Sequence, residues 1–243
     1  MPNLKRIILF ASLSLAVLGI VIAIMIGRKS DQEKDKATEE APASPVESNF
    51  KRINVPEDED IQKIKRIFDD YVKKDLGVIE KEKGYSQTQL VDENNSPISL
   101  DVFSKAVGIR INRNIRNILN QDDFVLVRCN DENSQSQRGI ILNVKLFKSF
   151  PDLYDKEMEW MREWEPTMLS DLHRVLFPNV AFDEAYLNKP LQFREGKYRY
   201  AEIELPDGMK SSINYNIVFD SIIITTSLPC LEKISLDYET PEP

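Results

Sequence analysis

Histidine and cysteine, the side chains that most often bind metals, are scarce in this 243-residue sequence. His173 is the only histidine, so a zinc motif built on paired histidines cannot be written. Cys129 and Cys230 lie far apart, without the C-x-x-C spacing of structural zinc sites and thioredoxin-type redox sites. They either form a disulfide, in an exported domain, or remain buried free thiols. We therefore expect no metal site in this chain.

The common nucleotide-binding and nucleophilic motifs are also missing. No two of the eight glycines form a G-x-G pair, so neither a dinucleotide fingerprint nor a phosphate-binding loop can be written. A Ser/His/Asp triad would have to use His173, but its neighbours Ser170 and Asp171 lie on the same predicted helix, and no G-x-S-x-G sequence occurs. We interpret His173 as a structural residue and expect no nucleotide and no other cofactor.

Carboxylates are the remaining candidates for catalysis, because the chain has 40 acidic residues. Glu163 and Glu165, on either side of Trp164, form the pair to examine, since an aromatic ring beside a carboxylate suits a sugar-binding site. The competing interpretation places both carboxylates on a solvated helix edge and Trp164 in the core. No catalytic residue is assigned on this basis.

Aromatic residues offer two candidate contact surfaces. Trp160, Met161 and Trp164 could form an exposed apolar patch for a partner protein, although such residues more often pack in the core. Tyr198 and Tyr200 share one face of a predicted strand and form a contact surface if that face points outward.

The N-terminal region predicts a membrane anchor. Residues 7–26 are 20 consecutive uncharged, mainly aliphatic positions, enough to cross a hydrocarbon layer about 30 Å thick as a helix. Arg28 and Lys29 follow without an A-x-A cleavage pattern, so we expect the helix to be retained. Basic residues flank the span on both sides, and the charge rule gives no orientation. We expect the short N-terminal tail in the cytoplasm and the rest outside.

Three regions follow from this anchor. Residues 1–29 form the cytoplasmic tail and transmembrane anchor, residues 30–55 a disordered linker with few large apolar side chains, and residues 56–243 one extracytoplasmic domain. Beyond residue 29 the chain has 28 basic and 40 acidic residues, a formal net charge of −12, which repels nucleic acid. The expected partners are the bilayer, through residues 7–26, and an envelope protein as a candidate; we expect no nucleic acid and no nucleotide.

The hydrophobic periodicity of the domain predicts helices and strands in alternating groups. Helices are expected from Pro56 to just before Gly77, over 100–107 between Ser99 and Gly108, over 113–119, over 151–176 with a break at Pro166, and over 229–236 after Ser227. Strands are expected over 124–129, 139–146, 198–205, 213–219 and 222–226.

A hairpin followed by a helix thus occurs twice, at 124–176 and at 213–236. This order predicts an α+β fold with one antiparallel sheet and helices on one face. In the second hairpin, strict alternation places Ile213, Tyr215, Ile217 and Phe219 on the inward face.

Three stretches between residues 122 and 234 resemble the hairpin-and-helix units of uncharacterised single-pass membrane proteins from small-genome bacteria of the candidate phyla: DDFVLVRCNDENSQSQRGIILNVKLF, WEPTMLSDL and INYNIVFDSIIITTSLPCLEKI. The resemblance implies a bacterial, membrane-anchored domain of unknown function and supplies no site residues. With no reactive constellation, we expect a binding or scaffold module of the cell envelope rather than an enzyme. The alternative is an envelope hydrolase that acts on glycan or peptide through carboxylates.

Overall fold

A computed structural model describes residues 51–55, 61–73, 84–92, 94–130, 136–145 and 153–240. All of them belong to Pro45–Pro243, the second of the two units into which the chain divides. The predicted anchor at 7–26 and most of the predicted linker lie outside the described residues. None of the helices in the described ranges combines the length and the hydropathy that a bilayer crossing requires.

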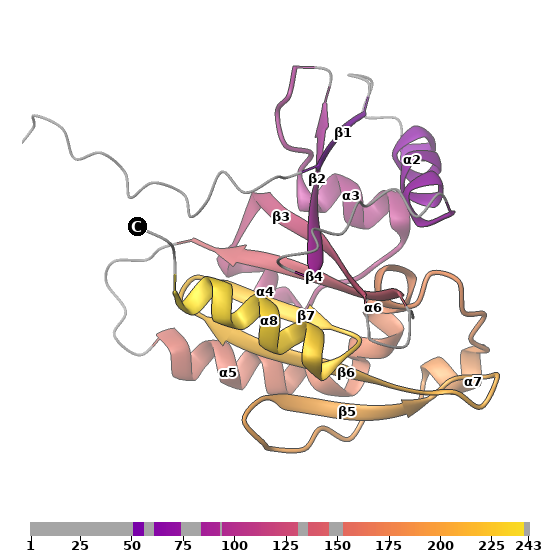
Figure 1. The fold of residues 1–243 in the computed structure, drawn as a ribbon, viewed down its shortest axis with the longest axis vertical. Helices are drawn as coiled ribbons and strands as arrows, with labels where there is room; N and C mark the ends of the chain where they lie inside the picture. Colours follow the sequence, from indigo (N-terminus) through magenta and orange to yellow (C-terminus); the bar gives the residue numbers. More distant parts are fainter. Residues whose placement is uncertain are drawn as a thin grey trace, which may run out of the picture. The chain divides into compact units, whose positions relative to one another are not determined.

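Single elements and short runs of helices and strands follow one another along the chain (Figure 1). In order they are β1 (Lys51–Val55), α2 (Ile61–Lys73), β2 (Tyr85–Asp92), α3 (Leu100–Val107), α4 (Arg113–Ile118), β3 (Leu119–Asn130), β4 (Ser136–Val144), α5 (Leu153–Trp164), the 3₁₀ turn η1 (Glu165–Thr167), α6 (Met168–Leu176), α7 (Glu184–Leu187), β5 (Arg199–Glu204), β6 (Lys210–Val218), β7 (Ser221–Thr225) and α8 (Leu228–Glu239).

The seven strands of the described ranges belong to one sheet of order β1-β2-β3-β4-β7-β6-β5. Strands β2 to β7 run antiparallel to their neighbours, which confirms the antiparallel α+β architecture. Strand β1 adds a parallel edge beside β2. Residues 51–55, whose composition predicts a linker, form this strand. Backbone pairing with β2 orders the segment although its composition is that of a tether.

The prediction of helices on one face is wrong, because helices cover both faces of the sheet. Helices α2 to α6 pack on one face and form the larger core, whereas α8 packs on β6 and β7 across the opposite face (Figure 1). The physical reason lies in the central strands, where consecutive apolar residues, such as Ile222, Ile223 and Ile224, are all buried. A strand of this kind must be covered on both sides.

A disulfide joins the sheet to α8. Cys129 of β3 and Cys230 of α8 are bonded, with their Cα atoms 5.9 Å apart, and both are buried in the smaller core. The structure therefore contains a disulfide rather than two buried free thiols.

The predicted hairpin of β6 and β7 is confirmed. Of the four residues predicted to point inward, three do so and one does not. Ile213, Tyr215 and Ile217 are buried, but Phe219 is 76% exposed. Val218 pairs with Ser221, so Phe219 is a residue of the two-residue turn and no longer follows the alternation of the strand. Its φ angle of 51° lies in the left-handed region.

Single-residue signals set several helix boundaries as expected. The hydroxyl of Ser99 accepts a hydrogen bond from the amide of Val102, and Gly108 ends α3 with φ 76°. Ser227 caps α8 in the same way. The segment around Pro166 forms the 3₁₀ turn that separates α5 from α6.

Candidate functional site

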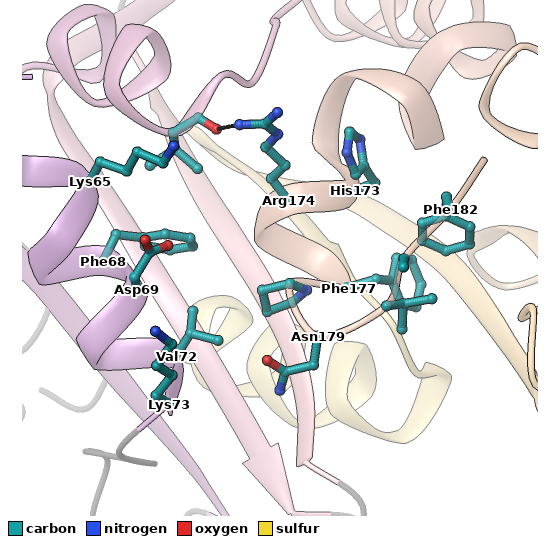
Figure 2. Close-up of a pocket in the computed structure, with 14 residues that line it drawn as sticks. Lys65, Phe68, Asp69, Val72, Lys73, His173, Arg174, Phe177, Asn179 and Phe182 are labelled. Carbon is teal, nitrogen blue, oxygen red and sulfur yellow. Dashed lines mark hydrogen bonds between the residues drawn. The ribbon is translucent and has the colours of Figure 1, made fainter. Parts of the chain in front are cut away.

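A cavity of about 330 Å³ lies between α2 and the end of α6 (Figure 2). Its floor is apolar and consists of Phe68 and Val72 of α2, Val107 of α3, and Phe177, which ends α6; all four are buried. Asn179 and the rest of the 177–182 segment close one side. The volume falls at the lower end of the range typical of small-molecule sites.

Helix α2 supplies the charged wall of the cavity. Lys65, Asp69 and Lys73 are four residues apart, so they share one helix face, directly beside the buried stripe that includes Phe68 and Val72. Both lysines are exposed and Asp69 is half-buried. Figure 2 shows the three charged side chains on the α2 side, across the cavity from His173, Phe177 and Asn179.

Arg174 is the cation on the α6 side, and a hydrogen bond holds it in place. Its Nη1 donates to the carbonyl oxygen of Val107 at 3.1 Å, at the C-terminal end of α3. This end carries the negative pole of the helix dipole, so the contact is favourable for a guanidinium. The described lining thus has three positive charges and one negative charge, in a chain whose overall charge is negative.

His173 lies beside Arg174 on α6 and is half-buried. Burial lowers its pKa most strongly; the nearby charge of Arg174 also lowers it, while the hydrogen bond to Ser170 and the charge of Asp171 oppose the shift. Nδ1 lies 2.9 Å from the carbonyl oxygen of Ser170, so the neutral ring carries its proton on Nδ1. The ring also packs edge-on against Phe182.

The sequence predicts a structural role for His173 and gives no sign that the other polar residues of this cavity lie together. The four-residue spacing of Lys65, Asp69 and Lys73 is visible in the sequence, but any solvated helix face shows the same pattern. Arg174 and Asn179 reach the cavity only because the tertiary fold places the end of α6 across the cavity from α2, and no local signal in the sequence reports that arrangement.

The structure separates the two candidate carboxylates, Glu163 and Glu165. Glu163 is exposed and accepts a hydrogen bond from Nδ2 of Asn114 at 3.1 Å. Glu165 is buried and accepts hydrogen bonds from Nε and Nη2 of Arg199, at 2.9 and 2.8 Å, and from the hydroxyl of Tyr215 at 2.7 Å.

In the network around Glu165, the hydrogen-bonding and charged groups pair with one another. Burial is the largest cause that raises the pKa of Tyr215, and the hydrogen bond to Glu165 and its charge act in the same direction, so the hydroxyl stays protonated and donates. For Arg199 burial lowers the pKa, but the hydrogen bond and the charge of Glu165 outweigh it and the pKa is raised. These three groups satisfy one another, which is typical of a structural ion pair.

Trp160, Met161 and Trp164 do not form an exposed apolar patch, and core packing, the commoner fate of such residues, holds for two of them. Met161 and Trp164 are buried in the larger core, and Trp160 is half-buried against it. The indole Nε1 of Trp164 donates to Asp171 at 2.9 Å.

Tyr198 and Tyr200 do not present a common outward face. Tyr198 is buried in the smaller core, whereas Tyr200 is half-buried.

In the described ranges, no three histidine, cysteine or acidic side chains gather at a place that could hold a metal ion. Comparison with known proteins gives no relative: no family model matches the chain, and no curated protein or solved structure matches it. The resemblance to single-pass bacterial membrane proteins therefore stays a prediction, and the function has to be argued from the site.

Proposed function

We propose that this chain is a membrane-anchored, extracytoplasmic binding or scaffold module of the cell envelope, and that the cavity between α2 and α6 binds a small organic anion. The observation that carries the proposal is the composition of the cavity. Three cations surround an apolar floor in a protein with eight more acidic than basic residues. A local concentration of positive charge on such a background suits an anionic ligand.

The ligand is best described as a carboxylate or phosphate attached to an apolar body. Lys65, Lys73 and Arg174 offer N–H donors to the anionic oxygens, and charge-assisted hydrogen bonds of this kind are among the stronger ones. The aromatic floor of Phe68 and Phe177 suits the apolar body.

The location outside the cytoplasm is supported by the disulfide between Cys129 and Cys230. Disulfides persist in oxidising compartments and are rare where glutathione keeps thiols reduced. The uncharged run at 7–26 supplies the anchor, and the polar segment after it supplies the tether.

The alternative, an envelope hydrolase, would use Glu163 and Glu165. The engagement of Glu165 by three hydrogen-bond donors favours a structural role for this carboxylate, and thus the binding module. If the purified protein turned over peptidoglycan, and Glu163→Gln abolished the turnover, the hydrolase would replace the binding module.

The test compares 4-phenylbutyrate with its uncharged amide, using the full-length protein in lipid nanodiscs and isothermal titration calorimetry. The acid is expected to bind and the amide to bind at least about tenfold more weakly, because only the acid pairs with the cations. The double variant Lys65→Gln, Lys73→Gln should weaken binding of the acid by about five- to tenfold, given the modest strength of exposed ion pairs.

The matched control is Lys63→Gln with Arg66→Gln, which makes the same charge change on α2 away from the described cavity lining. It should leave the affinity for phenylbutyrate within about twofold of the wild type, since charges outside the cavity are screened by solvent. Equal binding of acid and amide, or an equal loss in both double variants, would refute the anion site.

A further inference from the structure

A second hollow, of about 420 Å³, lies at the turn between β6 and β7, on a part of the surface that the anion cavity does not include. Its polar and aromatic lining comes from segments distant in the sequence: Tyr154 of α5, Lys197 and Tyr198 just before β5, Asn216 of β6, Phe219 of the turn, and Glu239 at the end of α8. Backbone pairing and the docking of α8 bring these residues together.

The two most exposed aromatic side chains among the described residues border this hollow. Phe219 is 76% exposed and Tyr154 is 56% exposed. Tyr198 is only 6% exposed and forms the inner wall. Scattered exposed apolar residues are ordinary, but two exposed aromatic rings that border one hollow form a concentrated contact surface.

The backbone at Phe219 supports a role for this ring. Its φ of 51° belongs to the left-handed region, which glycine or asparagine adopts far more readily than a bulky side chain. A glycine here would remove both the strain and the exposed ring. The chain instead carries a large aromatic side chain at a strained and exposed position, and such outliers often lie at functional sites.

The polar groups of the hollow balance one another in charge. Lys197 contributes a cation whose Nζ lies 4.8 Å from the ring centroid of Tyr198, and Glu239 contributes an anion. Asn216 is oriented by the hydrogen bond from its Nδ2 to Oγ of Ser235. The hollow thus lacks the excess of cations that characterises the cavity beside α2.

We infer that this hollow binds a segment of a neutral glycan chain. A pyranose ring has apolar C–H faces, which pack on aromatic rings, and hydroxyl edges, which need nearby donors and acceptors. The hollow combines these two chemistries, with the exposed rings of Phe219 and Tyr154 and an ammonium, an amide and a carboxylate beside them. An aliphatic ligand would cover those polar groups without offering them hydrogen bonds in place of those with water, and an anion would meet the carboxylate of Glu239.

The experiment titrates the full-length protein in lipid nanodiscs with chitohexaose and cellohexaose, two neutral β-1,4-linked oligosaccharides, by isothermal titration calorimetry. Saturable binding of at least one is expected. Phe219→Gly should weaken it at least about tenfold and at the same time raise the Tm, because the variant removes the ring and relieves the backbone. Phe219→Trp, which keeps an aromatic face, should bind within about threefold of the wild type.

Two further variants separate the ring contacts from a general effect on the fold. Tyr154→Ala should weaken oligosaccharide binding about fivefold or more. Met209→Ala removes another exposed apolar side chain, at the turn between β5 and β6, and should change nothing.

The inference is overturned if neither oligosaccharide binds, or if Phe219→Gly binds as the wild type does. It is also overturned if 4-phenylbutyrate displaces the oligosaccharide, which would place both ligands in one site.

Discussion

The buried network of Glu165, Arg199 and Tyr215 allows a quantitative test of the fold. The side chains of Glu165 and Arg199 are only 11% and 14% exposed, so solvent screens their interaction weakly. Replacing Arg199 by methionine leaves the carboxylate of Glu165 in a buried site with one of its three hydrogen bonds. Removal of one partner from a buried ion pair costs about 3–5 kcal/mol.

The companion variants give a graded series. Tyr215→Phe removes one hydrogen bond to a charged group and should cost about 1.5–3 kcal/mol. The double variant Glu165→Leu, Arg199→Met removes both charges, and such apolar replacements are often close to neutral. It should therefore be more stable than the single variant Arg199→Met.

The assay is thermal unfolding followed by circular dichroism. For a domain of this size, about 1 kcal/mol corresponds to about 2–4 °C in Tm, so Arg199→Met should lower the Tm by about 6–20 °C. Glu195 also contacts Arg199, but it is 73% exposed and its contribution is small. If Arg199→Met shifts the Tm by less than about 2 °C, or if the double variant is the less stable of the two, the network does not stabilise the fold in this way.

Four other measurements test separate parts of the structure. Burial and then the charge of Asp220 raise the pKa of Glu157 to about 7, so the folded state retains a proton that the unfolded chain loses above about 4.5. Stability should fall as the pH rises through this window, and Glu157→Gln should raise the Tm at pH 8 but not at pH 4, as thermal scans can show. Gly139→Ala places a Cβ 2.6 Å from the backbone oxygen of Ile224 and should cost about 1–3 kcal/mol in urea unfolding. Thiol titration of the denatured, unreduced protein should find no free cysteine if the disulfide is complete. Protease added to intact spheroplasts should degrade the domain, whereas full protection of the C-terminus would reverse the proposed orientation.

Sequence reasoning succeeds where a single residue sets the local backbone. The cap at Ser99, the left-handed glycine at position 108 and the missing amide of Pro166 act within one turn of chain. Each of them therefore marks a boundary that tertiary contacts do not move.

Strands β1 and β2 show where this reasoning stops. In β2, polar Gln87 and Thr88 are buried together with apolar neighbours, so the strand lacks the alternation that predicts half-buried sheets. Strand β1 depends on pairing with β2, which is a contact between distant segments. The three consecutive isoleucines at 222–224, by contrast, are a signal that the sequence does contain. A run of this kind indicates a strand buried on both faces, which argues against helices on one face alone.

Both candidate sites depend on contacts that the sequence does not encode locally. The anion cavity requires α2 and the end of α6 to lie on opposite sides of one space, and the aromatic hollow requires a turn that points Phe219 away from the core. The lining residues are individually ordinary, and only their convergence distinguishes them from a solvated surface.

The disulfide connects the proposed location of the protein with its architecture. In the described part of the chain, 34 buried residues form the core under α2 to α6, but only 11 form the core under α8. The smaller apolar layer gives α8 less hydrophobic stabilisation, and the bond between Cys129 and Cys230 fastens this helix to β3. Glu239 at the end of α8 also borders the aromatic hollow, so a covalent link that holds α8 also helps to fix the geometry of that site. An oxidising compartment would thus favour both the fold and the binding surface that we propose for it.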